Sequence, residues 1–218
     1  MKVNYPIVPE KTAMIVVDMQ NDFVKEGAPI EIPRARAMVP RLNRLLSACR
    51  EHNILVIYIH HAIRGGDIDA GRLADHHEAV RNSKAIIAGT ENVEIYDALK
   101  PHPGDLLVAK PRYSAFHGTD LEAILRSKGF DTLIISGTVT DVCCESTARD
   151  AFSRDYKVIF LSDGNAAGDW PDVGFGPVSA DEVQRVALTV LAMCFAQVSS
   201  IDDVIAELER LPSGVKAR

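Results

Sequence analysis

The sequence lacks several features that would each define a class of protein. Its 218 residues contain no run close to the ~20 apolar residues that a membrane-spanning helix needs. The first residues, MKVNYPIVPEKT, have no apolar core of a secretion signal. We therefore expect neither a membrane partner nor export. Linkers, internal repeats and low-complexity tracts are also lacking, which favours one domain over residues 1–218.

Clustered positive charge and a disulfide framework are missing as well. The chain has 24 Lys and Arg against 30 Asp and Glu, a formal net charge of −6, whereas nucleic-acid surfaces need clustered basic residues. Four cysteines, two of them adjacent, do not form the pattern of a secreted disulfide protein, so we expect a reducing, cytoplasmic location. No G-x-G-x-x-G follows the first apolar run and no P-loop occurs, which disfavours a nucleotide enzyme.

Short apolar runs alternate with amphipathic segments along the chain. The apolar runs cover residues 13–17, 54–59, 106–109, 133–135 and 158–161. Apolar residues at helical spacing occur within residues 38–49, 121–125, 183–194 and 204–211. Continuous apolar runs are typical of strands buried on both faces of a parallel sheet. The alternation predicts βαβ units and an α/β fold, a three-layer α/β/α sandwich.

Two longer segments are expected to be loops. The stretch from Gly65 to Gly89 is polar, and we expect a loop with one short helix there. Residues Asp163 to Pro177 include four glycines and two prolines, which predicts a long loop, and long loops in compact domains are often functional. Trp170 and Phe175 lie in this second loop. A lid over a site and a subunit contact would both explain these aromatic residues.

Three reactive side chains lie where predicted strands end. Asp18 follows the first apolar run, Lys110 follows the third, and Cys143 lies in the first turn of the helix after the fourth. Ligands of parallel α/β sheets bind beyond the carboxyl ends of the strands, so we expect the three side chains to converge. A helix N-terminus lowers the pKa of a thiol. Asp18 would then take the thiol proton, and Lys110 would stabilise both anions. The amide of Cys143 and another from residues 137–139 would form an oxyanion hole.

Each of these residues also has an ordinary structural explanation. An Asp after a strand is commonly a turn residue, a Lys at a strand end is commonly solvated, and a Cys between apolar neighbours commonly lies in the core. Cys144 competes with Cys143, because adjacent helical residues point ~100° apart and only one can face the strand ends. The adjacent pair could instead sense redox state. A non-hydrolytic module that binds a metabolite or senses thiol oxidation is therefore the alternative to an enzyme.

Three ordered sequence blocks carry a family resemblance over about residues 11–200. They read TAMIVVDMQNDF, AKPRYSAFHGTDLEAILRSKG and LIISGTVTDVCCESTARDAFSRDYKVIFLSD. They are similar to the corresponding blocks of the isochorismatase-like cysteine hydrolases. The resemblance implies a six-stranded parallel sheet of order 3-2-1-4-5-6 and a homo-oligomer, either a dimer or a tetramer. In that order Lys110 starts from an outer strand and must reach inward.

The resemblance also implies residue roles. It makes Asp18 the base, Lys110 the stabilising cation and the first of the adjacent cysteines, Cys143, the nucleophile. It implies a cis peptide bond between Thr138 and Val139, and an oxyanion hole made of the amides of Val139 and Cys143. Isochorismatases proper cleave a vinyl ether and lack the cysteine, so the cysteine favours the amide-hydrolysing branch.

No cofactor and no metal are expected. Nicotinamidases of this branch carry a metal-binding D-x-H motif, which is absent from the matching stretch VIYIHHAIRGGDIDAG. Histidines 60, 61, 76 and 77, with Asp67 and Asp69 nearby, could in principle bind a metal. Adjacent histidines on an extended chain point to opposite faces, however, so we expect them on the surface or in a pocket wall. A nicotinamidase-like aromatic amide hydrolase remains the alternative within the family.

These observations favour a small amide or ureide as substrate, with a ureido or carbamoyl group preferred. Tyr113 matches a tyrosine of the ureidoacrylate-type hydrolases that the sequence resembles, and its hydroxyl would hydrogen-bond a polar substrate. Phe23 and Phe116 are candidates for the cavity lining, although core packing explains them equally well. Arg64 would receive a substrate carboxylate, unless it is simply a solvated loop residue.

Overall fold

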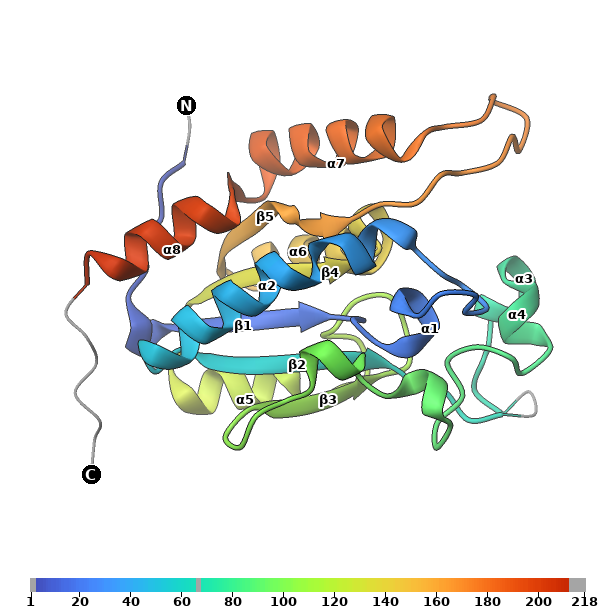
Figure 1. Cartoon of the computed structure of the whole chain (residues 1–218), viewed down its shortest axis with the longest axis horizontal. Helices are drawn as coiled ribbons and strands as arrows, with labels where there is room; N and C mark the ends of the chain where they lie inside the picture. Colours follow the sequence, from blue (N-terminus) through green and yellow to red (C-terminus); the bar gives the residue numbers. More distant parts are fainter. Residues whose placement is uncertain (1–2, 66–67, 212–218) are drawn as a thin grey trace.

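The computed structural model describes residues 3–65 and 68–211 and is built on a single parallel sheet. Its strands are β1 (Thr12–Val17), β2 (Leu55–His61), β3 (Leu106–Lys110), β4 (Thr132–Thr138), β5 (Lys157–Ala166) and β6 (Gln197–Ser199). The order is β3-β2-β1-β4-β5-β6, and every neighbouring pair is parallel (Figure 1). The predicted fold class and strand order are confirmed.

Helices cover both faces of the sheet. The α-helices are α1 (Asn21–Val24), α2 (Pro33–Glu51), α3 (Leu73–His76), α4 (Glu78–Arg81), α5 (Leu121–Lys128), α6 (Glu145–Phe152), α7 (Ala180–Cys194) and α8 (Ile201–Glu209). Short turns are the 3-10 helices η1 (Pro9–Lys11), η2 (Glu91–Val93) and η3 (Asp97–Leu99), and a π-helical turn, η4 (Thr140–Cys144). Apolar contacts join α2 and α8 to one face, and α5, α6 and α7 to the other. Among the described residues, no helix is both long and apolar enough to cross a membrane.

Strand β1 explains why the central strands are apolar throughout. Met14 and Val16 belong to the core on the α2 side, whereas Ala13, Ile15 and Val17 belong to the core on the α5 side. All five side chains are fully buried. Burial of each larger one stabilises the fold by about 1.5–3 kcal/mol, so both faces of the strand select apolar residues.

The helix boundaries follow the local sequence. Proline at the first position, Pro33, starts α2, where the missing amide hydrogen costs nothing. Gly129 ends α5 in the left-handed conformation at φ 71°, as the sequence predicts. Ser179 caps α7 through a reciprocal pair of hydrogen bonds with Glu182.

The structure differs from the sequence expectations in three places. Strand β6 has only three half-buried residues, and it gains its place by pairing with β5. Strand β5 continues to Ala166, so the first part of the expected loop at Asp163–Pro177 is strand, and the remaining connection projects away from α7 (Figure 1). The polar stretch after Gly65 holds two short helices, α3 and α4. Asp67, named above as a possible ligand, lies outside the described residues.

Candidate active site

Three side chains meet beyond the carboxyl ends of the strands. Asp18 follows β1, Lys110 ends β3, and Cys143 lies in η4 directly after β4. The Nζ atom of Lys110 lies 2.8 Å from Asp18 Oδ2 and 3.3 Å from Cys143 Sγ. Asp18 and Lys110 are fully buried and Cys143 is 2% exposed. The structure thus brings together the three residues that the strand ends predict.

Lys110 reaches this cluster from the edge of the sheet. Its strand, β3, is the outer one, and its backbone lies beside His61 of β2. Neighbouring strands are ~4.8 Å apart, so the lysine side chain has to pass the end of β2 to reach Asp18. A third contact, 3.0 Å to the carbonyl oxygen of Arg112, completes its hydrogen bonding. The ammonium thus makes two hydrogen bonds and one ion pair.

The end of β1 is shaped to present Asp18. This residue adopts φ 52°, and its amide donates a 2.8 Å hydrogen bond to the carbonyl of Ile59. On the other side, Gly137 of β4 approaches β1 so closely that a Cβ atom there would lie 1.9 Å from the carbonyl oxygen of Val17. Only glycine fits at this approach. The approach brings the end of β1 and Asp18 next to the start of η4 and Cys143.

Cys143 is held by its backbone and separated from its neighbour. Its carbonyl accepts a 2.7 Å hydrogen bond from Thr147 Oγ1 in α6. The peptide bond between Thr138 and Val139 is cis, as the family resemblance implies. Cys144 is fully buried in the core on the α5 side. The described residues that line the cavity include Cys143 and do not include Cys144.

Burial dominates the electrostatics of the cluster. It raises the pKa of the Cys143 thiol above its ordinary range. The charge of Asp18 also raises this pKa, and the charge of Lys110 lowers it by less. Burial also raises the pKa of Asp18, opposed by Lys110. For Lys110, burial lowers the pKa, but Asp18 and Cys143 outweigh it, so the net shift is upward and the ammonium stays charged. From the sequence, a helix N-terminus was expected to lower the pKa of Cys143, whereas burial raises it.

Cys143 opens onto a cavity of about 250 Å³. This is slightly below the usual range for small-molecule sites, which suits a small ligand. Val139, Phe23 and Tyr113 also line it, as expected from the sequence. Phe23 is 6% exposed and contacts the core on the α2 side, so it serves both as core residue and as cavity wall. The cavity places an apolar chamber directly over the sulfur.

Two predicted substrate contacts lie elsewhere. The ring centroid of Phe116 lies 5.9 Å from that of Tyr156, the guanidinium of Arg154 lies over the Phe116 ring, and Phe116 is not among the described residues that line the cavity. The prediction that it lines the cavity is therefore wrong, and the core alternative holds. Arg64 is also outside the cavity wall: its side chain is 72% exposed and pairs with Asp69 at 3.3 Å.

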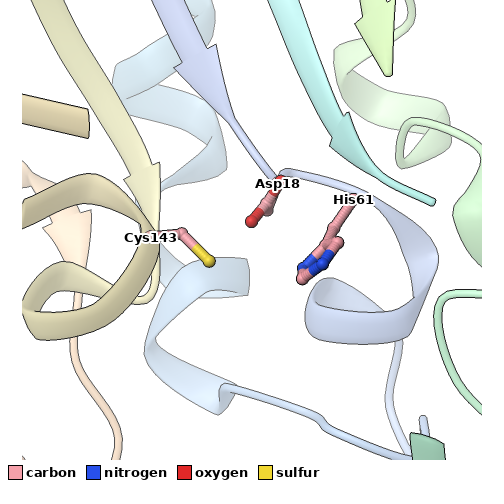
Figure 2. A group of neighbouring side chains, drawn as sticks. All are labelled: Asp18, His61 and Cys143. Carbon is pink, nitrogen blue, oxygen red and sulfur yellow. The ribbon is translucent and has the colours of Figure 1, made fainter. Parts of the chain in front are cut away.

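Two of the histidines that were expected on the surface or in a pocket wall, His61 and His77, line the cavity. The His61 ring hydrogen-bonds the backbone of Pro111, and within the described chain its Nε2 atom has no partner. This ring faces Asp18 and Cys143 (Figure 2), and the three potential ligand atoms lie within 4.8 Å of one another. Burial keeps the pKa of His61 well below its ordinary value. The second histidine, His77, lies 3.0 Å from the hydroxyl of Tyr113.

Asp18, His61 and Cys143 together form a possible set of metal ligands. The ammonium of Lys110 already contacts two of the three, and its positive charge opposes a metal cation at that point. The chemistry of the site thus favours an organic substrate over a metal. The absence of a metal remains a prediction.

Buried polar residues in the first sequence block anchor the surrounding loops. Gln20 accepts a 2.7 Å hydrogen bond from the amide of His61 and donates one of 3.1 Å to its carbonyl. Asp22 accepts 2.8 Å from the amide of Ile86. Both side chains are fully buried. These bonds hold the segments that carry His61 and Ile86 against the end of β1. The polar residues within MQNDF, directly after an apolar strand, were the sequence feature that could have indicated this role.

The connection before α7 closes one side of the cavity. Trp170 lines it, and its Nε1 donates a 2.8 Å hydrogen bond to Asp141 in η4. Phe175, five residues further on, is 94% exposed. The base of this loop is therefore a wall of the site, while its tip is free for another contact.

The fold and these motifs match known proteins. The isochorismatase domain model matches residues 12–203. A ureidoacrylate amidohydrolase, RutB, from Rhizobium rhizogenes is 30% identical over 93% of this chain and 85% of its own length. A crystal structure of a cysteine hydrolase from Pseudomonas syringae pv. phaseolicola is 44% identical with a TM-score of 0.93, covering 96% of this chain and 97% of that one.

A more distant solved structure has the same architecture. The N-carbamoylsarcosine amidase of Thermoplasma acidophilum is 27% identical with a TM-score of 0.69, over 88% of this chain and 97% of that one. The domain match spans most of the sequence, including the segments that carry Asp18, Lys110 and Cys143. The chain belongs to the isochorismatase family of hydrolases.

Proposed function

We propose that the protein hydrolyses a carbon–nitrogen bond of a small amide or ureide, with Cys143 as nucleophile. The observation that carries this proposal is the position of Lys110, which contacts both Asp18 and the sulfur of Cys143 within a buried cluster. A cation at that point stabilises negative charge on either partner as a proton passes between them. The names of the ureidoacrylate amidohydrolase and the N-carbamoylsarcosine amidase support a ureido or carbamoyl substrate.

In the first half of the reaction Asp18 takes the proton of the Cys143 thiol while the sulfur attacks the substrate carbonyl carbon. The raised pKa of the thiol means that it rests protonated and needs this base. The carbonyl oxygen becomes an oxyanion, for which we assign the amides of Val139 and Cys143 as donors. Each such donor stabilises the transition state by roughly 3 kcal/mol.

The second half returns the enzyme to its starting state. Asp18 gives the proton to the leaving nitrogen, because an amide anion is too basic to depart, and ammonia or an amine is released. An acyl or carbamoyl group then remains on Cys143 as a thioester or thiocarbamate. Asp18 takes a proton from water, the hydroxide attacks this carbonyl, and the sulfur leaves and regains a proton. The steps use no cofactor and no metal.

A comparison of the two adjacent cysteines tests this proposal. Ammonia release from a panel of amides and ureides is expected to be lost in Cys143→Ala and largely retained in Cys144→Ala. The second variant is a matched control, since it removes the same atoms from a side chain that faces the core. Unchanged turnover by Cys143→Ala would refute the assignment of the nucleophile.

The cellular setting is part of the same proposal. All four cysteines are free thiols, which is typical of proteins in a reducing compartment such as the cytoplasm. We also propose that the enzyme acts as a single-domain homo-oligomer.

A further inference from the structure

The cavity wall carries no positive charge that could hold an anionic substrate. Ile32, Leu73 and Val80 are typical of its mainly apolar lining. Among the described residues that line it, none is Lys or Arg, and the charged ones are Glu31 and Asp169. The immediate wall therefore favours a neutral ligand and repels an anion.

Three cations that adjoin residues of this wall already have partners. Lys110 donates to Cys143 and to a backbone carbonyl and forms an ion pair with Asp18. Arg36 pairs with Glu31 at 2.7 Å and donates to a carbonyl of α1. Arg112 donates to the carbonyl oxygens of Asp69 and Pro111. Among the described residues that line the cavity, none of these three cations appears.

The histidines do not supply the missing charge. Burial lowers the pKa of both His61 and His77, so both rings are neutral at pH 7. The hydroxyl of Tyr113 is within hydrogen-bond distance of His77, which occupies one polar position of the wall. The polar groups of the wall are thus neutral histidine rings and a tyrosine hydroxyl. A site that binds an anion would have guanidinium or ammonium groups in these positions.

The free atom of His61 indicates what does bind. We assign the hydrogen bond from this ring to the backbone of Pro111 to Nδ1, because Nε2 has no partner among the described residues. Nε2 is then a lone-pair acceptor, on a ring with a nitrogen within 4.8 Å of the reacting groups of Asp18 and Cys143. Figure 2 shows the ring turned toward both. A buried acceptor without a partner calls for a donor from the ligand. The NH or NH2 of an amide or ureide supplies one, whereas a carboxylate supplies none.

We infer that the substrate is an uncharged amide or ureide, whose N–H donates to His61 Nε2 and whose other end is a hydrophobic group in the chamber lined by Ile32, Leu73 and Val80. This inference rests on the proposed function and narrows it to neutral substrates. The relative from Rhizobium rhizogenes is named for ureidoacrylate, which carries a carboxylate. The two enzymes then differ in specificity while sharing a reaction.

Matched substrate pairs of nearly equal shape test the inference. Butylurea ends in an ethyl group where 3-ureidopropanoate ends in a carboxylate. Pentanamide and succinamate differ in the same way and form the amide pair. Ammonia release gives kcat/KM for the wild-type protein. Ligand-observed NMR with Cys143→Ala measures binding without turnover. Because an unpaired buried carboxylate is strongly disfavoured, we expect the neutral member of each pair to exceed the anionic one by about a hundredfold or more.

The two measurements separate this inference from the proposed function. Turnover and binding that favour the neutral members support both. Turnover of the carboxylates at equal or higher kcat/KM overturns the inference and leaves the hydrolase intact. Selective binding of the neutral members without any turnover supports the cavity assignment and contradicts the reaction. If no member of either pair is bound or hydrolysed, both the inference and the proposed function are overturned.

His61→Phe gives an independent readout of the polar end. The ring keeps its bulk but loses the acceptor, so KM for butylurea is expected to rise with little change in the unfolding midpoint. Restored affinity in His61→Gln, whose amide oxygen is an acceptor, would support the hydrogen bond. Equal KM values in all three proteins would contradict it.

Discussion

The charged side chain of Lys110 is fully buried. Burial of a charge is unfavourable in free energy unless a partner of opposite charge lies beside it. An isolated ammonium in such a place would lose its proton or unfold the site, whereas Asp18 at 2.8 Å holds it charged. The pair is consequently a poor source of stability and a good source of fixed electrostatic field. This combination is typical of residues selected for chemistry.

Removal of one partner should therefore harm the fold more than removal of both. Lys110→Met leaves Asp18 buried without a counter-charge, so we expect about 3–5 kcal/mol lower free energy of unfolding. Asp18→Asn with Lys110→Met should recover much of this loss, although both proteins would be inactive. Urea denaturation of the single and double variants checks the sign. A double variant less stable than Lys110→Met would contradict it.

The thiol of Cys143 should titrate late. Because its pKa is raised by burial and by Asp18, the thiolate fraction at neutral pH is lower than for an ordinary cysteine. Thiolate absorbance near 240 nm, taken as wild type minus Cys143→Ala, is expected to stay flat from pH 6 to about 9. A thiolate signal already present at pH 7 would contradict the account in which Asp18 removes the proton during attack.

The acid side of the activity profile reports on Asp18. Its pKa is raised by burial, so this base becomes protonated at a higher pH than an ordinary carboxylate does. We expect kcat/KM to fall as the pH drops through that raised value, with protein still folded by circular dichroism. A profile that is flat down to pH 4 would show that no base with a raised pKa takes part.

Strand-end reasoning works for Asp18, Lys110 and Cys143 because parallel topology alone brings strand ends to one edge. It does not work for side-chain direction. In the adjacent pair His60 and His61, it is His61 that lines the cavity. The sequence alone does not indicate which of the two side chains points toward the cavity. Phe116 was misplaced for the same reason, since the direction of a loop side chain depends on packing that only the fold determines.

At the level of secondary-structure elements, the joint between β4 and α6 decides the site. Here β4 ends in a close approach to β1, and η4 carries Cys143 before the regular helix begins. A π-helical turn is a frequent feature of functional sites. The sequence placed Cys143 in an ordinary first helical turn after the fourth strand, because a single extra residue in a turn leaves no mark on a short apolar pattern. Strand β6 was implied by the family resemblance alone, since three residues carry no period.

Gly137 should therefore be intolerant of any side chain. Gly137→Ala places a Cβ against the backbone of Val17, with φ at 138°, so β1 and β4 must separate. We expect a loss above about 3 kcal/mol in unfolding free energy, together with loss of activity. Gly104→Ala is the matched control: φ is 100° there, nothing lies within 4 Å, and the cost should be about 1–2 kcal/mol. Equal losses in the two variants would contradict the close-approach argument.

For the molecule as a whole, exposed apolar side chains gather on the last part of the chain. Val173 and Phe175 at the loop tip are 77% and 94% exposed, and Met193 on α7 is 79% exposed. Met193 lies at the far end of α7 from the loop, so Val173 and Phe175 at the tip are the two that lie close together. The fold class and strand order were predictable because apolar runs and motifs extend along most of the chain. The surface used for assembly was not predictable, because surface residues obey no comparable period.

The loop tip with Val173 and Phe175 is where we expect the predicted homo-oligomer to form. Phe175→Asp introduces a charge at the loop tip and is expected to shift the protein to a smaller species in light scattering after size-exclusion chromatography. Val8→Asp, on a residue 43% exposed ahead of β1, is the control and should leave the mass unchanged. An oligomer of the same mass in Phe175→Asp, or a wild-type monomer, would contradict this placement.

The most direct test is to catch the bond that the sulfur forms. Wild-type protein is mixed with a hydrolysed amide or ureide, quenched in acid within a turnover, and digested for mass spectrometry. The account predicts that the peptide containing Cys143 gains the acyl or carbamoyl group of the substrate and that hydroxylamine, added before quenching, removes it. Turnover with an unmodified Cys143, or with the group on Cys144, would contradict it.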